Sequence, residues 1–386
     1  MRKTKFSILL IGFRGYLLLG LSSIIAKLAA EFSSASITQV QQVMTLPSLV
    51  GIPTILILGV LMTRFRKKPL ALICLFISIF AALPLFFYNS FGLLLAASVF
   101  LGLSNGVNTV ISSMINEQFE GHERHAMTGI YTGMGQLGGV VFSLVGGLLA
   151  SEHWHYLYAV FLIGIPVFFV AAICLPRGEV PLKAVKATED AAQTRRFGRA
   201  ALYIVLLVFY MAAIHSVALN NSLLLTEKGI DSTAMAGLIV AIMTGSGAVL
   251  GLLYGPLRKL LKRFLLPFGA LIPIVGFIIL AFSKNLVLYA VGSICIGVSI
   301  SIQLPASIMK CSDIVPKAAV PFTISLVLVA QYLGNSLSAV GITAIASLFN
   351  LTTAEGKMLV CTGLMCILFV IYLVLSCRKN PASENE

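Results

Sequence analysis

Acidic residues are scarce in this sequence, and none of them lies deep inside an apolar run. Only 14 of the 386 residues are Asp or Glu, against 27 Lys and Arg, and charged residues make up 11% of the chain. Soluble domains carry about 25% charged residues, so the composition excludes an ordinary soluble fold. A membrane-depth carboxylate, the usual residue for a proton relay or for binding a cationic drug, is also lacking.

Residue patterns for metal, cofactor or catalytic chemistry are lacking too. The seven cysteines lie in or beside apolar segments without disulfide or metal-ligand spacing, so we interpret them as reduced packing residues. The stretch GMGQLG at 133–138 matches G-x-G-x-x-G by letter, but it lies in an apolar helical run with no preceding strand. The sequence therefore predicts no metal, no cofactor and no enzyme activity.

Long apolar runs are what the sequence does contain. Hydrophobic residues make up 58% of the chain and the mean hydropathy is +0.99. Runs of ~20 residues, enough to cross a ~30 Å hydrocarbon core as a helix, lie at 6–29, 38–62, 69–87, 92–115, 127–150, 156–175, 200–225, 233–254, 265–283, 286–309, 321–348 and 358–377. These runs predict an all-α membrane protein with twelve transmembrane helices.

The longest polar stretch divides the runs into two sets of six. We predict a first six-helix bundle over 1–176, a central loop over 177–199 and a second six-helix bundle over 200–386. The first run follows Arg2, Lys3 and Lys5 and could suggest a signal peptide, but an arginine in its middle is atypical of one. We therefore expect that run to be retained as a span.

The basic residues predict the orientation. Of the 27 Lys and Arg, 22 lie at the two termini or in the loops that share their side, whereas the other side holds only Lys27, Lys228, Lys284 and Lys357. The positive-inside rule then places both termini and the central loop in the cytoplasm, in a multi-pass protein that we expect in a bacterial inner membrane. The net charge of +13 follows this pattern and forms no phosphate-binding stripe, so we predict no nucleic-acid partner.

The two halves resemble each other at a shift of 196 residues. Gly51 then falls on Gly247, Glu117 on Asp313, and Leu137-Gly138 on Leu333-Gly334, without a gap. Two similar six-span halves predict a pseudo-symmetric pair of bundles that rock against each other around a central cleft.

The loop GVLMTRFRKKPLA at 59–71 is similar to the G-x-L-x-D-R-x-G-R-K signature of the major facilitator superfamily, and the likeness extends over the whole chain. The matching positions are Gly59, Leu61, Arg64, Lys67 and Lys68. Thr63 stands where that family has the Asp that latches the cytoplasmic ends of the halves. The resemblance implies a transporter in which Gly59, Arg64, Lys67 and Lys68, together with Glu117 and Asp313, belong to a conformational loop.

Departures from that family argue against drug/proton antiport. Phe142-Ser143 replaces the Gly-Pro pair of the antiporters, and Gly102 stands where proton-coupled drug exporters carry an Arg. We therefore expect an anion-type member of the family in place of a standard drug antiporter.

Arg14 lies inside the first apolar run with no acid within sixteen residues on either side. A charge near mid-membrane costs ~2.5–3.5 kcal/mol, and a bound anion would offset this cost, because a guanidinium matches carboxylate or phosphate oxygens two at a time. Alternatively, Arg14 snorkels to headgroups, caps carbonyls of a neighbouring helix, or pairs with Glu117 or Asp313. The 196-residue shift aligns Arg14 with Tyr210, so only one of these two matched positions carries a cation. A single cation suits a monovalent anion better than a dianionic phosphate ester.

Amide, tyrosine and histidine side chains occur at a similar depth in the other spans. Lipid-facing amides cost free energy, so this set predicts a polar cavity, although each alone could be an interhelical hydrogen bond. The candidate substrate-binding residues are Arg14, Asn105, Asn108, Tyr131, Gln136, Tyr210, His215, Gln303, Gln331, Tyr332 and Asn335. His215 is either a proton acceptor, with an unperturbed pKa of about 6.5, or a packing residue.

The leading hypothesis is a monomeric carrier of a small organic anion that works by alternating access. Uniport, anion exchange and proton symport through His215 all remain open. A multidrug exporter is the alternative, because the chain contains 24 Phe and 11 Tyr. A third class is a membrane protein that does not transport, such as a receptor or a lipid translocator, and the repeat and the polar spans argue against a receptor.

Overall fold

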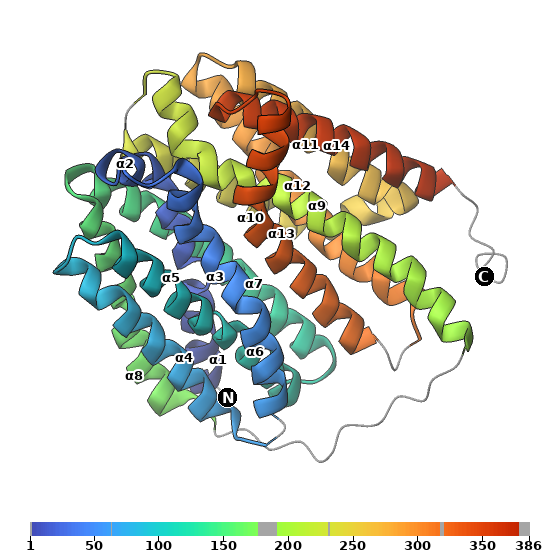
Figure 1. Ribbon diagram of the computed structural model, residues 1–386. Helices are drawn as coiled ribbons and strands as arrows, with labels where there is room; N and C mark the ends of the chain where they lie inside the picture. Colours follow the sequence, from blue (N-terminus) through green and yellow to red (C-terminus); the bar gives the residue numbers. More distant parts are fainter. Residues whose placement is uncertain (1, 63, 177–190, 231, 317–319, 378–386) are drawn as a thin grey trace.

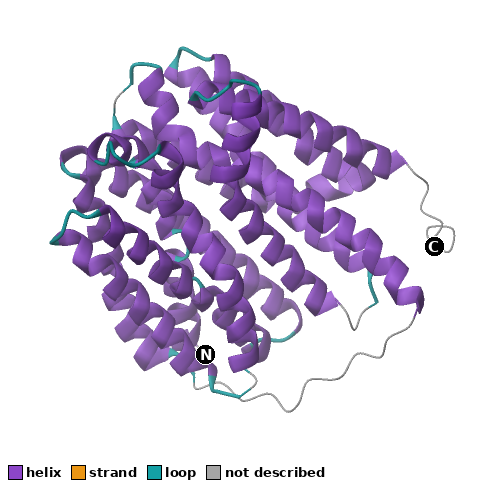
Figure 2. Ribbon diagram, viewed as in Figure 1, coloured by secondary structure: helices purple, strands orange, loops and turns teal. Residues whose placement is uncertain are grey.

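The computed structural model describes residues 2–62, 64–176, 191–230, 232–316 and 320–377, which form helices joined by short loops (Figures 1 and 2). Within these ranges there is no strand, and twelve helical spans are long and apolar enough to cross a membrane. The all-α membrane fold predicted from the apolar runs is confirmed.

The helices of the first half, with η marking a 3-10 helix, are α1 (Arg2–Arg14), η1 (Leu17–Ser23), α2 (Ile25–Glu31), α3 (Ile37–Leu61), α4 (Lys67–Ala82), η2 (Leu83–Phe86), α5 (Phe91–Ser104), α6 (Gly106–Gln118), α7 (Gly121–Glu152), η3 (Trp154–Ile163) and α8 (Gly164–Cys174). Those of the second half are α9 (Ala191–Glu227), α10 (Thr233–Leu261), η4 (Lys262–Phe264), α11 (Leu265–Phe282), α12 (Leu286–Ile314), α13 (Val320–Leu348) and α14 (Ala354–Cys377). Because α9 begins at Ala191, nine residues of the predicted central loop are helical, and the rest of that loop lies outside the described residues.

Four spans of the first half are interrupted or change helix type, the third where α4 continues as η2, whereas the sequence suggested continuous helices. The first span changes from α1 to η1 at Gly15 and Tyr16, and the fourth breaks between α5 and α6 at Asn105. The sixth begins as the 3-10 helix η3 before it continues as α8. Interrupted helices leave backbone groups without their i→i−4 partners, and in membrane proteins they are tolerated where they line a cavity or are buried in protein.

The molecule has two faces that hold the helix ends. We call the face with the start of α1 at Arg2 and the end of α14 at Cys377 the termini face, and the other the opposite face (Figure 1). Two hydrophobic clusters fill the first half. The one nearer the termini face includes Ile11 and Met114 and draws on the first half alone, whereas the one nearer the opposite face includes Leu219 and Ala339 of the second half. The cores of the two bundles therefore join toward the opposite face.

Hydrogen bonds between the bundles strengthen this contact. Gln41 on α3 donates from Nε2 to Asn220 Oδ1 on α9 at 2.9 Å, and Thr233 on α10 donates to the Gly147 carbonyl on α7 at 3.1 Å. The amide of Ala26 donates to Ser222 Oγ at 3.1 Å. These partners come from the opposite-face ends of their helices, so the structure is a conformation closed on that face.

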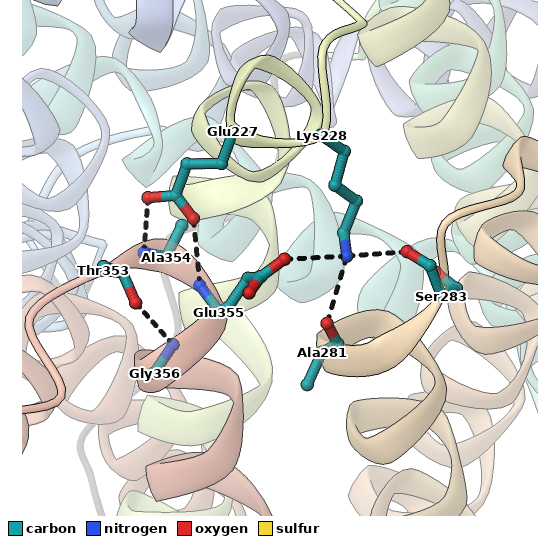
Figure 3. Close-up of polar contacts among 8 residues, drawn as sticks. All are labelled: Glu227, Lys228, Ala281, Ser283, Thr353, Ala354, Glu355 and Gly356. Atoms are coloured by element: carbon teal, nitrogen blue, oxygen red, sulfur yellow. Dashed lines mark hydrogen bonds and ion pairs between the residues drawn. The ribbon is translucent and has the colours of Figure 1, made fainter.

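A charged cluster on the opposite face ties together three helices of the second bundle (Figure 3). The Glu227 carboxylate accepts from the amides of Ala354 at 2.8 Å and Glu355 at 3.2 Å, which caps the N-terminus of α14. Lys228 Nζ donates to the carbonyl oxygens of Ala281 at 3.0 Å and Ser283 at 2.7 Å at the end of α11. The ends of α9, α11 and α14 are thus fixed to one another by charge-assisted hydrogen bonds.

Candidate functional site

Arg14 is the last residue of α1, and a close approach between α1 and α7 fixes its position. The backbone of Phe13 packs directly on Gly138, where a side chain on α7 would collide with the Phe13 carbonyl. Arg14 lies twelve residues after Arg2, roughly 18 Å along the helix axis at 1.5 Å per residue. It lies between the two hydrophobic clusters of the first bundle.

The guanidinium of Arg14 is buried and incompletely bonded. The residue is 6% exposed. Its Nη2 donates to Ser104 Oγ at a distance of 3.5 Å, and its Nε has no hydrogen-bond partner among the described residues. At 3.5 Å the one bond is at the long limit for a side-chain hydrogen bond. This burial argues against snorkelling to the headgroups.

Comparison with the other buried cations shows what Arg14 lacks. Within the described ranges the buried cationic side chains are Arg14, Lys67 and Lys357. Lys67 forms an ion pair with Glu117, and Lys357, in the first turn of α14 and not in the loop where the sequence placed it, lies within electrostatic reach of Glu227. Arg14 has no acidic group at ion-pair distance within the part of the chain that the structure describes.

A small cavity lies against the Arg14 side chain. It measures about 10 Å³, room for about one water molecule. Its lining comes entirely from the first bundle: Arg14, Gly15, Leu17, Leu18, Leu101, Ser104, Asn105, Asn108 and Phe161. The first, fourth and sixth spans therefore meet at this cavity, and Asn105 is the N-cap residue of α6 there.

Asn108 joins the cavity to a group of tyrosines. Its Oδ1 accepts a 2.8 Å hydrogen bond from the Tyr131 hydroxyl on α7, and the Tyr332 side chain on α13 lies near the same amide. The Tyr332 ring packs on Gly51 of α3, across the boundary between the bundles. Tyr16 packs on Gly135 and Gly139 of α7, the helix that also carries Tyr131.

Tyr210 occupies the position in the second bundle that the repeat matches to Arg14. It is fully buried in the core of that bundle, where its hydroxyl bonds Ser299 Oγ, and Ser299 in turn donates to the Gly269 carbonyl at 2.6 Å. The repeat therefore pairs two polar residues that lie inside their own bundles. The structure does not bring Tyr210 to the Arg14 cavity.

The remaining candidates lie apart from the cavity. Gln303 on α12 is buried against Gly269 inside the second bundle. His215 on α9 is half-buried, and its Nε2 has no partner among the described residues. Gln136 on α7 and both Gln331 and Asn335 on α13 are half-buried as well.

The residues predicted for the conformational loop lie at the termini face. Lys67 at the start of α4 pairs with Glu117 at the end of α6, so the pair links two helices of the first bundle. In the described ranges Glu117 therefore pairs with Lys67 and forms no ion pair with Arg14. The side chains of Arg64 and Asp313 are exposed, Lys68 is half-buried, and Gly59 has no atom within 4 Å of the place for a Cβ. Thr63 lies outside the described residues.

Several residues of this region were not singled out by the sequence. Ser104 bonds Arg14 but reads as an ordinary small residue beside Asn105, and Tyr16 looked like a span aromatic. Gln41 gave no signal of its partner Asn220, because the two are 179 residues apart. The only feature of the sequence that pointed to this site was proximity along the chain: Ser104 is next to Asn105, and Tyr16 is two residues from Arg14.

The family follows from this architecture and from direct comparison. A Major Facilitator Superfamily model matches residues 6–339 and, in a second match, residues 201–386. The chain belongs to the Major Facilitator Superfamily. It is a membrane transporter and not an enzyme. The chain has no significant match among curated protein sequences.

Solved transporters share the fold at low sequence identity. A point mutant of the nucleoside transporter NupG superposes with a TM-score of 0.81 at 13% identity, covering 96% of this chain and 99% of that one. The peptide transporter POT in complex with sulfate gives 0.79 at 13% identity, covering 97% and 93%. An inward-facing, occupied bacterial homologue of the human lysosomal transporter Spinster gives 0.71 at 19% identity, covering 98% of both chains. At these identities the likeness establishes the fold alone.

Proposed function

We propose that this transporter carries small organic monocarboxylates by alternating access, with Arg14 binding the carboxylate. The observation that carries the proposal is a buried guanidinium with one long hydrogen bond, a partnerless Nε and no acid at ion-pair distance in the described ranges. A desolvated cation stabilises a bound anion far more than an exposed one does, because little water screens the charge. Asn105, Asn108 and Ser104 supply neutral polar groups beside it.

The transport cycle that we propose starts from the conformation described above. Substrate enters from the termini face, and the bundles then rock so that the contacts at Gln41, Ala26 and Thr233 separate on the opposite face. We place the termini face in the cytoplasm of a bacterial inner membrane and the protein as a monomer. Uniport, anion exchange and proton symport through His215 are all compatible with this scheme.

Ligand-induced stabilisation of the purified protein tests the binding step. A ligand at a hundredfold excess over its Kd stabilises the folded state by about 2.7 kcal/mol. We expect monocarboxylates to raise the melting temperature of the wild type but not of Arg14→Gln. Because Arg14→Gln removes an unpaired buried charge, we expect its ligand-free melting temperature to equal or exceed that of the wild type.

The controls separate this proposal from its competitors. Arg2→Gln removes an exposed arginine from the same helix as Arg14 and should leave the monocarboxylate response unchanged. Nucleosides, dipeptides and cationic drugs belong in the same panel. Equal stabilisation of Arg14→Gln by monocarboxylates would contradict the proposal, and stabilisation by cationic drugs alone would favour the multidrug alternative.

A further inference from the structure

The cavity at Arg14 is too small for a whole organic anion. At about 10 Å³ it has room for about one water molecule, so a carboxylate oxygen could take that place while the body of the ligand must lie elsewhere. Four of the nine lining residues are Leu or Phe, and Asn108 is the lining residue that also bonds Tyr131 outside the cavity. The body of a ligand held at Arg14 would therefore extend past Asn108.

Three phenol rings from different elements converge beside Asn108. Tyr131 on α7 donates to its Oδ1 at 2.8 Å, Tyr16, which precedes η1, packs on Gly135 of α7, and Tyr332 on α13 packs on Gly51 of α3. Tyr16 is 36% exposed, and Tyr131 and Tyr332 are half-buried, so these rings are not sealed in a core. Aromatic rings prefer offset or edge-to-face contacts with other rings and supply large contact areas.

Charge and aromatic surface are adjacent here. The Tyr131 hydroxyl is bonded to Asn108, and the Asn108 side chain lines the cavity at the Arg14 guanidinium. We infer that the substrate is a planar aromatic carboxylate, with its carboxylate in the Arg14 cavity and its ring among Tyr16, Tyr131 and Tyr332. This inference rests on the proposed function and specifies its substrate class.

The location of Tyr332 gives this ring site a role in the conformational cycle. Tyr16 and Tyr131 belong to the first bundle, whereas Tyr332 belongs to the second and packs on Gly51 of α3. A ring held among the three would touch both bundles while its carboxylate touches only the first. Ring binding, and not carboxylate binding alone, would then couple occupancy to the movement between the bundles.

Four ligands that vary charge and ring shape separately test the inference. The probes are benzoate, cyclohexanecarboxylate, acetate and benzamide, and dissociation constants are measured by isothermal titration on wild-type protein. We expect benzoate to bind about two- to tenfold more tightly than cyclohexanecarboxylate, because one planar ring gains aromatic contacts that a puckered ring cannot make. Acetate should bind more weakly than both, and benzamide should not bind measurably.

Variants assign the ring preference to the tyrosines. Tyr332→Leu and Tyr16→Leu should abolish the preference for benzoate over cyclohexanecarboxylate while acetate still binds, whereas Tyr332→Phe should keep the preference. Tyr156→Leu, which removes an exposed tyrosine of η3, is the matched control. Because Tyr16 and Tyr332 lie on different bundles, a folding defect in one leucine variant leaves the other as the test.

The possible failures are distinguishable. If the carboxylates bind in an Arg14-dependent way but benzoate has no advantage that depends on Tyr332 or Tyr16, the aromatic inference is overturned and the proposed function stands. If benzamide binds as tightly as benzoate and Arg14→Gln changes neither, the anion anchor and the inference both fail.

Discussion

At the scale of single residues, the structure separates two kinds of buried cation. Lys67 is 2% exposed and paired with Glu117, whereas Arg14 is 6% exposed and has no acid at ion-pair distance in the described ranges. A paired cation stabilises the arrangement of its helices, and an unpaired one is a cost that ligand binding can offset. Removing the charge partner of Lys67 should therefore destabilise the protein, whereas removing the charge of Arg14 should not.

Removing the partner of Lys67 should destabilise the first bundle. Glu117→Gln leaves a buried ammonium without its counter-ion, and we expect a loss of about 1–3 kcal/mol, the usual cost of an unsatisfied buried polar group. Thermal unfolding of the purified variant measures the change. Glu123→Gln is the matched control, because the Lys5–Glu123 pair has side chains 38% and 43% exposed and exposed pairs contribute about 1 kcal/mol or less. Equal losses in both variants would contradict a structural role for the buried pair.

The sequence showed which residues are chemically unusual for a membrane span better than it showed where their side chains lie in the fold. The absence of acids deep in apolar runs made Arg14 conspicuous, and the structure locates it in a buried position. The sequence could not show that Tyr210 faces the core of its own bundle, because hydropathy does not distinguish an inward face within a bundle from a face toward the cleft. Partners distant in sequence, such as Gln41 and Asn220, were equally invisible.

At the scale of helices, α7 and α10 make the closest contact between the bundles. A Cβ on Gly147 would lie 2.7 Å from the Thr233 carbonyl oxygen and 3.0 Å from Gly237 Cα, and a Cβ on Gly237 would collide with the Ser143 carbonyl. Small residues let membrane helices approach this closely, and van der Waals packing holds them together without a hydrophobic driving force. The contact is near the opposite face, where it helps to close the structure.

A methyl group at this contact should push the opposite face open. We expect Gly237→Ala to lengthen the distance between spin labels attached at Ile37→Cys on α3 and Met235→Cys on α10. Pulsed electron paramagnetic resonance measures this distance in a protein whose exposed native cysteines have been replaced. Overpacking usually costs about 1–3 kcal/mol, so thermal stability should fall as well. Gly251→Ala on the same helix has open space around its Cβ and should change neither quantity. An unchanged label distance in Gly237→Ala would show that this contact does not hold the face closed.

The helices also show where sequence patterns stop being informative. Apolar runs predicted all twelve spans, because a span needs about 20 apolar residues whatever its details. The breaks at Gly15 and Asn105 and the 3-10 helix η3 were not predicted, since the runs continue through them without proline. Gly15, Asn105 and Phe161 of these segments line the Arg14 cavity, and the linear sequence does not show that they meet in space.

At the scale of the whole molecule, the two halves have the same architecture but different chemistry. The repeat matches Arg14 to Tyr210, and the structure finds both inside their bundles, one beside a cavity and the other in a bonded network. The cavity lining belongs entirely to the first bundle, whereas the tyrosines around Asn108 come from both. In the mechanism that we propose, the first bundle binds the charge and the second senses the body of the substrate.

Uptake of radiolabelled benzoate into proteoliposomes tests the central claim most directly, because it measures anion recognition and transport together. Wild-type protein should give saturable uptake that unlabelled benzoate competes away. Loss of a hydrogen-bonded charge costs about 1.5–3 kcal/mol, so Arg14→Gln should reduce uptake at subsaturating benzoate by roughly tenfold or more while its melting temperature stays at or above that of the wild type. Wild-type uptake by a folded Arg14→Gln protein would contradict the account.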